Sequence, residues 1–358
     1  MGGVKPLTPR GAEGGTPRLL DIATQAGVSE ATASRVLNGK PGVAAATRQK
    51  VLAALDVLGY ERPVRLRQRS AGLIGLIIPE LTNPIFPAFA QVIEQVLAGY
   101  GYTPVLCTQM PGGSTEDELV EQLEERGVNG IVFLSGLHAD TTADTVRYAR
   151  LAERKVPFVL INGFNEQINA PFVSPDDRSA ARMAVRHLVD LGHERIGLAI
   201  GPTRFVPSRR KAEGFVAALH TMLGVGRPEA EKLIQRTLFT VEGGHAAGGA
   251  LVEAGCTGIV CGSDPMALGV IRAVRERGLD VPRDISVIGF DDSPLIPFTD
   301  PPLTTVRQPV QAMATAAVGA LLEEIGGTPV QRTEFVFQPE LVVRDSTAQV
   351  ARRHDGGA

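Results

Sequence analysis

The sequence predicts an α/β protein in which a small N-terminal helix-turn-helix module of three helices precedes a larger body of doubly wound parallel sheets. Near the N-terminus, a short helical segment lies between two glycine turns in the stretch GVSEATASRVLNGKPGV. From residue 73 onward, apolar runs alternate with amphipathic segments, a pattern typical of a parallel sheet covered on both faces. About 270 residues of this kind exceed one hydrophobic core, so we expect two lobes.

The composition is that of a globular protein without a membrane span. Hydrophobic residues make up 44% of the chain and charged residues 21%, values usual for globular domains. No apolar run reaches the ~18–20 residues that cross a bilayer, and the first residues lack the apolar segment of a secretion signal. We therefore expect a cytoplasmic protein with a disordered tail over residues 1–17 and no membrane contact. Buried, reduced thiols are expected at Cys107, Cys256 and Cys261.

Basic residues are concentrated at the N-terminus. Residues 1–70 contain eleven Lys and Arg against five Asp and Glu, which is a net charge of +6, whereas the whole chain has a net charge of −3. A basic head on an acidic body is the distribution expected where only the head meets a polyanion such as DNA. A charged tail that only aids solubility would have the same composition.

Three short helices are expected in the head. Apolar residues recur at helical spacing over 19–26 and 30–37, with a turn at Gly27 and Ser29 as the N-cap of the second helix. A third helix over 45–58 has a predicted packing stripe of Val51, Leu52, Leu55 and Leu58. Two helices joined by a tight glycine turn form a helix-turn-helix, whose second helix enters the major groove of DNA.

The second helix separates an apolar face from a polar face that is expected to meet DNA. Arg35 can donate to guanine O6 and N7, Glu30 can accept from cytosine N4, and Ala31 can touch a thymine methyl group. Short polar side chains nearby suit phosphate oxygens. The predicted DNA-contacting residues of this helix and its ends are Ser29, Glu30, Ala31, Thr32, Ser34, Arg35 and Asn38. A helical cap with a solvated polar face is the alternative.

The head resembles the DNA-binding headpiece of the lactose-repressor (LacI) family over almost its whole length. The resemblance is carried by LLDIATQAGVSEATASRVLNGKPGVAAATRQKVLAALDVLGYERP. It implies a DNA-binding domain over residues 18–62, with base-reading positions at Glu30, Ala31 and Arg35.

A basic connector over residues 63–72 follows the head. In the LacI family this stretch is a hinge helix whose leucine wedges between base steps in the minor groove. Here the connector is shorter than usual, and Leu66 rather than Ser70 is the nearest candidate for the wedge. Arg65 and its neighbouring arginines are expected to contact phosphates, which predicts binding that depends strongly on salt. A solvated linker is the alternative.

Seven apolar runs in the body are bounded by glycine or proline and are expected to be strands. They are LIGLIIP, TPVLCTQ, GIVFLSG, PFVLING, RIGLAIGP, TGIVCGSD and DISVIGFDD. Helices are expected over 84–99, 115–126, 178–191, 208–223 and 266–278. The effector-binding and dimerisation domain is expected over 73–345, with a first lobe of about 73–163 and 293–325, a second lobe of about 164–292 and 326–345, and a flexible tail over 346–358.

Polar side chains and one aromatic ring follow the predicted strands, where ligands of such sheets bind. The residues placed there include Phe86, Ser135, Asn162, Ser263 and Asp291. Directional hydrogen bonds with a stacking face suit a neutral polyhydroxyl ligand such as a sugar, and the sequence has no Gly-rich phosphate-binding turn. For single residues the alternatives are helix capping by Ser263 or Asp291 and core packing of Phe86.

The body resembles the regulatory domain of the same family, which is similar to periplasmic binding proteins. TNPIF, LGHERIGLAIGP, CGSDPMALGVIRAVRERGLDVPRDISVIGFDD and PPLTTVRQP carry this resemblance. It implies effector contacts at Phe86, Asn162, Ser263 and Asp291. The family usually has arginine where Lys211 stands, so either Lys211 or the adjacent Arg210 is expected to anchor the ligand. The pattern is most similar to actinobacterial regulators of maltose or α-glucoside operons.

These features predict a transcriptional repressor that leaves its operator when a sugar effector binds between the lobes. No leucine heptads follow residue 343, so we expect a homodimer on two half-sites of double-stranded operator DNA. No cofactor and no metal are expected, and the scattered histidines argue against an enzyme. A transport protein with this body would have no use for the basic head. A regulator whose ligand strengthens DNA binding, or one that activates transcription, is the remaining alternative.

Overall fold

A computed structural model describes residues 18–37, 42–58, 71–109 and 112–350. The chain consists of two units, a headpiece that ends at Arg69 and a body that begins at Ser70. The predicted contacts Asn38, Arg65 and Leu66, the tail over 1–17 and most of the connector lie outside the described residues. In the described parts of the chain, no helix is both long enough and apolar enough to cross a bilayer.

The headpiece contains the three helices that the sequence predicts. They are α1 (Leu19–Ala26), α2 (Glu30–Leu37) and α3 (Ala45–Leu58). Gly27 ends α1 with φ +65°, a left-handed conformation that glycine adopts without strain. The small core comprises Ile22, Ala23, Ala26, Ala33, Val36, Val51 and Ala54. The prediction that Leu52 packs in the core is wrong, because its side chain is 49% exposed. Ala54 of the same helix is buried in the core instead.

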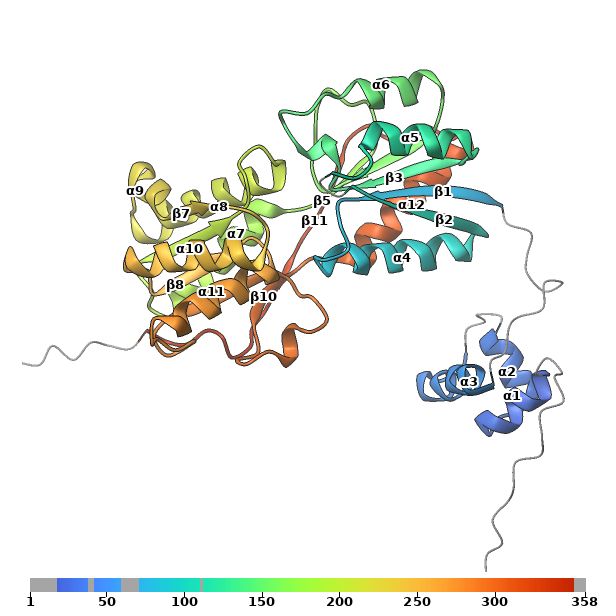
Figure 1. Ribbon diagram of the computed structural model, residues 1–358, viewed down its shortest axis with the longest axis horizontal. Coiled ribbons are helices and arrows are strands. Elements are labelled where there is room, and N and C mark those ends of the chain that lie inside the picture. The colour runs from blue at the N-terminus through green and yellow to red at the C-terminus, as the bar shows by residue number, and fades with distance from the viewer. Residues whose placement is uncertain (1–17, 38–41, 59–70, 110–111, 351–358) are drawn as a thin grey trace, which may run out of the picture. The chain divides into compact units, whose positions relative to one another are not determined.

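The first lobe of the body contains a six-stranded sheet whose strands are all parallel (Figure 1). In spatial order its strands are β11 (Glu334–Phe337), β5 (Phe172–Pro175), β4 (Phe158–Ile161), β3 (Gly130–Leu134), β1 (Gly72–Ile78) and β2 (Tyr102–Thr108). Its helices are α4 (Ile85–Gly99), α5 (Glu116–Glu125), α6 (Val146–Glu153) and α12 (Val310–Ile325). Separate apolar cores lie under α4 and α12 on one face and under α5 and α6 on the other.

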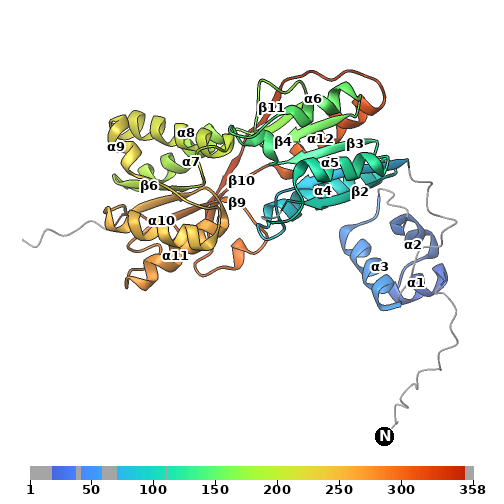
Figure 2. The same ribbon diagram turned by 45° about the horizontal axis from the view of Figure 1, so that its top comes forward.

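The second lobe repeats this design. In spatial order its strands are β12 (Glu340–Val342), β10 (Thr304–Arg307), β9 (Ser286–Asp291), β8 (Gly258–Cys261), β6 (Ile196–Ile200) and β7 (Ile234–Arg236). Only β12 is antiparallel to its neighbour. Its helices are α7 (Asp177–Asp190), α8 (Val206–Leu223), α9 (Arg227–Lys232), α10 (Val241–Glu253) and α11 (Asp264–Glu276). Figure 2 shows α7 and α8 on one side of the sheet and α10 and α11 on the other.

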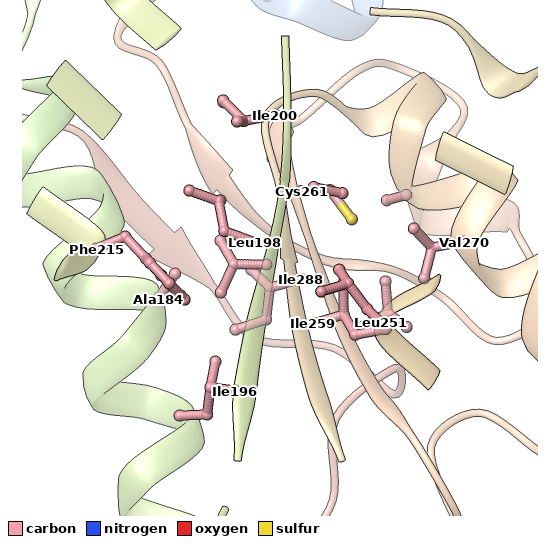
Figure 3. Close-up of a cluster of buried hydrophobic side chains, with 14 of the residues drawn as sticks. Ala184, Ile196, Leu198, Ile200, Phe215, Leu251, Ile259, Cys261, Val270 and Ile288 are labelled. Carbon is pink, nitrogen blue, oxygen red and sulfur yellow. The ribbon is translucent and has the colours of Figure 1, made fainter. Parts of the chain in front are cut away.

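Strand side chains of the second sheet alternate between its two faces and meet helices on both (Figure 3). Phe215 of α8 and Ala184 of α7 lie on one side of the strands, and Leu251 of α10 and Val270 of α11 lie on the other. All four side chains are completely buried. Cys256 and Cys261 are buried in this core as predicted, whereas Cys107 in the first lobe is only half-buried.

The predicted lobe boundaries are wrong, because the chain crosses between the lobes at other positions. Strand β5 at 172–175 pairs with β4 and β11, so the first lobe extends past residue 163 to residue 175. Strand β10 pairs with β9, which places the segment 293–307 in the second lobe. The chain returns to the first lobe for α12 and β11 and then crosses back to the second lobe at β12.

Part of the predicted C-terminal tail packs against the second lobe. The Ser346 side chain is buried, and its Oγ donates to the Val287 carbonyl at 2.6 Å. Ala348 receives a hydrogen bond from the His193 ring at 3.1 Å, and Val350 N donates to the Leu191 carbonyl at 3.0 Å. The expectation of a flexible tail is therefore wrong for residues 346–350. Residues 351–358 lie outside the described part of the chain.

Candidate ligand cavity and nucleic-acid interface

Helix α2 presents the predicted DNA-contacting residues on the side away from the headpiece core. Glu30, Ala31 and Arg35 are exposed, whereas Ala33 and Val36 on the opposite side are buried. This distribution follows from the 3.6-residue period of the helix, which places positions i, i+1 and i+5 together on one side. The helix therefore offers a carboxylate, a methyl group and a guanidinium on one outward face.

Ser29 and Thr32 contact each other at the start of α2. Ser29 Oγ accepts a hydrogen bond from Thr32 N at 3.2 Å and lies 2.9 Å from Thr32 Oγ1. Ser29 is thus the N-cap that the sequence predicts, because it satisfies one backbone N–H that the helix leaves unpaired. Ser29 is exposed, and Thr32 and Ser34 are half-buried beside the outward face.

The body contains a cavity of about 310 Å³ that is lined by residues of both lobes. Phe86, Ser135 and Asn162 line it from the first lobe, and Lys211, Ser263 and Asp291 line it from the second. The structure therefore brings together six of the seven residues predicted for the effector site. Most of them follow strands, at the carboxyl ends where ligands of doubly wound sheets bind.

Arg210 is the exception among the predicted effector contacts. It does not line the cavity; its guanidinium forms a bidentate ion pair with Glu334 of β11, with N–O distances of 2.6 and 2.9 Å. Lys211 is one position further along α8 and points into the cavity instead, because successive helix residues differ by about 100° in direction. The expectation that Arg210 contacts ligand is wrong.

Strained backbone conformations are concentrated at this site. Ser135, Asn162, Asp291 and Asp292 all have positive φ angles of 49°, 66°, 115° and 60°. Lys155 is the remaining non-glycine example among the described residues. Such conformations cost roughly 1–3 kcal/mol each and persist where the surrounding structure holds them, often at ligand sites. At Ser135, Asn162 and Asp291 they turn the side chains toward the cavity, whereas the adjacent Asp292 forms ion pairs with two arginines.

Aromatic rings form much of the cavity wall. Beside Phe86, the cavity is lined by three rings of the second lobe that the sequence pattern did not predict: Phe205, Phe239 and Phe290. Phe239 can occupy its place only because residue 201 is glycine: a Cβ at Gly201 would lie 2.0 Å from a carbon of the Phe239 ring. These rings provide flat apolar faces suited to the C–H faces of a sugar.

Two side-chain amides of the cavity wall have unsatisfied acceptors. Asn162 Nδ2 donates to Ser135 Oγ at 3.1 Å, and Gln308 Nε2 donates to Asp291 Oδ1 at 2.6 Å. The oxygens Asn162 Oδ1 and Gln308 Oε1 are buried and have no hydrogen-bond partner among the residues that the structure describes. A buried acceptor without a partner costs about 1–3 kcal/mol, so both oxygens favour a ligand that brings hydroxyl donors. Gln308 follows β10, a strand that is not among those expected from the sequence.

Carboxyl groups deep in the second lobe are held at raised pKa values by burial. Burial raises the pKa of Asp264 to about 6, although its carboxylate accepts hydrogen bonds from Ser293 N and Thr305 Oγ1 at 2.7 Å. The pKa of Asp291 is raised well above its usual value, first by burial and second by the nearby charge of Asp264. Ser263 caps α11 by accepting from Met266 N at 3.4 Å, so it has a structural role as well as a place in the wall.

The two lobes touch at the edge of the cavity. The Arg204 carbonyl accepts hydrogen bonds from both Thr141 N and Thr141 Oγ1 at 2.9 Å. The Arg204 guanidinium lies 3.0 Å from Asp140 Oδ2 and covers the Phe205 ring at 4.8 Å. Asp140, Arg204 and Phe205 all line the cavity, so this contact encloses its contents on one side.

Both parts of the chain match known protein families. Residues 18–62 match the bacterial regulatory proteins of the lacI family, and residues 185–347 match the periplasmic binding protein-like domain. The first match covers the three helices of the headpiece, and the second covers most of the second lobe together with α12 and β11.

Curated relatives are similar to this chain over nearly their whole length. An HTH-type transcriptional regulator in the aml 5′ region of Streptomyces limosus is 79% identical, over 95% of this chain and 97% of its own. The HTH-type transcriptional regulator MalR of Streptomyces coelicolor is 70% identical, over 93% of this chain and 97% of its own.

Solved structures show the same fold. A complex of the transcriptional regulator CelR with cellobiose has a TM-score of 0.69 and 29% identity, covering 92% of this chain and 99% of its own. The lac repressor dimer bound to operator and the anti-inducer ONPF has a TM-score of 0.67 and 28% identity, covering 93% and 100%. The chain thus belongs to the lacI family of bacterial regulatory proteins, as a DNA-binding transcriptional regulator and not an enzyme.

Proposed function

We propose that this regulator is a homodimeric repressor of a carbohydrate-utilisation operon and that a neutral sugar, with maltose or another α-glucoside as the first candidate, releases it from its operator. The observation that carries the proposal is the pairing of two unsatisfied acceptors, Asn162 Oδ1 and Gln308 Oε1, with aromatic walls in one cavity. A sugar brings hydroxyl donors and flat C–H faces, so it satisfies both features at once.

The cavity size agrees with a ligand of this class. Its volume of about 310 Å³ is at the lower end of the range of roughly 300–1,000 Å³ for small-molecule pockets. The effector contacts in this proposal are Phe86, Ser135, Asn162, Lys211, Ser263 and Asp291, together with Gln308. The names of two similar proteins support a sugar: MalR, and CelR in complex with cellobiose.

In this proposal DNA is bound by the headpiece over residues 18–62 with the connector 63–72, in the cytoplasm. The base-reading residues are Glu30, Ala31 and Arg35, whose side chains lie on the outward face of α2. DNA phosphates are contacted by Ser29, Thr32, Ser34, Asn38 and Arg65. Leu66 is the candidate for the side chain that inserts between base steps. A dimer would place two headpieces on two half-sites about one helical turn apart, and the operator-bound lac repressor dimer supports that assembly.

The response to sugar follows from the two-lobed architecture. A ligand that contacts both lobes stabilises the arrangement in which its contacts are complete, at the expense of other arrangements. In this proposal, that arrangement positions the two headpieces unfavourably for the operator. Sugar binding then lowers operator affinity, at most by the ratio of the sugar's affinities for the two arrangements of the lobes.

The test combines ligand binding with operator binding. A thermal-shift screen with maltose, cellobiose, ribose and other neutral sugars identifies ligands, because a ligand that binds only the folded state raises the melting temperature, and more so as its concentration exceeds its Kd. Each hit is then titrated into a complex with an operator selected from random DNA duplexes, at fixed salt. Loss of operator affinity supports repression with release by sugar. Tighter binding would identify a co-repressor, and no effect of any sugar would contradict the proposal.

A further inference from the structure

The cavity wall contains two cationic side chains among its described residues, Lys211 and Arg204. Four carboxyl side chains line the same cavity: Glu80, Asp140, Asp177 and Asp291. An anionic ligand, such as a phosphorylated sugar, would need at least one of the two cations as its partner, because an unpaired charge in a partly dehydrated site is costly. The state of these two cations therefore decides which charge a ligand can carry.

Lys211 is already paired. Its Nζ lies 2.5 Å from Asp177 Oδ1 and 3.9 Å from the centre of the Phe290 ring. The Lys211 side chain is only 9% exposed and that of Asp177 only 2%, so solvent screens this ion pair weakly. An anion that reached Lys211 would have to compete with a carboxylate at hydrogen-bond distance and a ring on a second side.

Arg204 is paired as well. Its Nε lies 3.0 Å from Asp140 Oδ2, and its guanidinium covers the Phe205 ring. Its carbonyl holds Thr141 of the opposite lobe through two hydrogen bonds, which fixes the backbone that carries the guanidinium. This cation of the cavity wall is therefore already engaged in the contact between the lobes.

Two side-chain oxygens of the wall can only accept, and the Ser135 and Ser263 hydroxyls are neutral groups that can still donate. Within the described part of the chain, Asn162 Oδ1 and Gln308 Oε1 have no partner, and the Asp291 carboxyl accepts a hydrogen bond from Gln308. Oxygens of a phosphate or carboxylate would meet these acceptors and the carboxyl groups, and the hydroxyl donors left to them bring no compensating charge. Sugar hydroxyls, by contrast, can donate to all three.

We infer that Asp177 and Asp140 make this cavity selective against phosphorylated and other anionic sugars by pairing its two cations. The inference rests on the proposed function, because it assumes that the cavity binds sugars. It assigns Asp177 and Asp140 as residues that determine specificity, with Asp177 as the stronger of the two because its ion pair is more deeply buried.

The experiment measures affinities for matched neutral and phosphorylated ligands by calorimetry on the full chain. The probes are glucose with glucose 6-phosphate, maltose with maltose 6′-phosphate, and cellobiose with cellobiose 6′-phosphate. In the wild type, we expect each phosphorylated sugar to bind at least ~100-fold more weakly than its neutral parent, as expected for an anion without a partner. In Asp177→Asn, the freed Lys211 should reduce this ratio to less than about tenfold.

A second pair of variants assigns the gain to Lys211 itself. Asp177→Asn combined with Lys211→Met should lose the gained affinity for the phosphorylated sugar, because the cation is then absent. Glu213→Gln is the matched control on the same helix: it breaks an exposed ion pair with Arg178 and should leave the ratio unchanged. If the variants at 177 unfold, Asp140→Asn frees the half-exposed Arg204 and should reduce the ratio to a smaller extent.

The outcomes separate this inference from the proposed function. A phosphorylated sugar that binds the wild type as tightly as its neutral parent overturns the inference and leaves sugar binding in place. A ratio that stays at the wild-type value in both folded Asp177→Asn and Asp140→Asn also overturns it. If no sugar binds the wild type at all, the proposed function fails, and this inference fails with it.

Discussion

Arg210 of α8 and Glu334 of β11 join the two lobes by a bidentate ion pair, with N–O distances of 2.6 and 2.9 Å. Both side chains are 14% exposed, so the pair is largely shielded from water. Glu334 lies at the start of the strand that returns the chain to the first sheet, whereas Arg210 belongs to a helix of the second lobe. The pair therefore fixes a crossover between the lobes, which explains why Arg210 is not a ligand contact.

Arg210→Met should lower the free energy of unfolding by about 2 kcal/mol, because it removes charge-assisted hydrogen bonds and leaves Glu334 without its partner. Urea denaturation would measure the loss as a lower midpoint. Arg178→Met is the matched control, since Arg178 forms an exposed ion pair with Glu213 and its loss should cost less than ~1 kcal/mol. Equal losses in both variants would show that the Arg210–Glu334 pair stabilises the fold no more than an exposed ion pair does.

Gly201→Ala should weaken sugar binding by roughly tenfold, because overpacking of about 1–3 kcal/mol displaces an aromatic wall. The new Cβ would lie 2.0 Å from a Phe239 ring carbon, and the ring can only move by changing the cavity. Calorimetry with the sugar found in the screen would measure the change. The control is Gly226→Ala, whose Cβ would meet only Pro228 at 3.9 Å and whose φ is −65°. Unchanged affinity in Gly201→Ala would show that Phe239 is not part of the binding surface.

The cavity was largely predictable from the sequence because the chemistry follows the strands. Ser135, Asn162 and Asp291 come directly after long apolar runs, and the carboxyl ends of parallel strands meet at one edge of a sheet. The choice between Arg210 and Lys211 was not predictable, because neighbouring residues of a helix point in directions about 100° apart. Only the packing of α8 decides which of the two faces the cavity.

The lobe boundaries were not predictable for a related reason. Strand β5 has only four residues and ends at Pro175, next to two aspartates, so its sequence resembles a turn as much as a strand. Its position is determined by pairing with β4 and with β11, which lies more than 150 residues further along the chain. Sequence periodicity contains no information on a pairing at that separation.

His138 should make the body sensitive to acid. Its ring is completely buried, and burial lowers its pKa to about 4 from the usual 6.5. The folded state therefore binds fewer protons than the unfolded state between these values, and stability falls as the pH falls through this window. The full loss would be about 3 kcal/mol at and below pH 4, from the size of the shift.

Urea denaturation at pH 7 and pH 5 would measure this loss. His138→Gln removes the titrating ring, so the difference in unfolding free energy between the two pH values should shrink. His220→Gln is the control, because His220 is exposed and its replacement should leave the difference unchanged. An undiminished difference in His138→Gln would assign the acid sensitivity to other groups.

Arg35→Ala should lower operator affinity by about 10- to 100-fold, which corresponds to the loss of one bidentate contact with guanine. Arg35 is exposed on the outward face of α2, whereas Ala33 and Val36 of this helix are buried in the headpiece core. The headpiece should therefore remain folded in Arg35→Ala. Sugar affinity should not change, because Arg35 belongs to a separate unit of the chain.

Fluorescence anisotropy at fixed salt with operator and with single-base variants would measure both affinity and specificity. Lys50→Ala is the control, because it removes the same charge from an exposed side chain of α3. Loss of charge alone weakens binding to all duplexes alike, whereas loss of a base contact removes discrimination at one base pair. If Arg35→Ala and Lys50→Ala both weaken all duplexes by the same factor, α2 does not read the bases through Arg35.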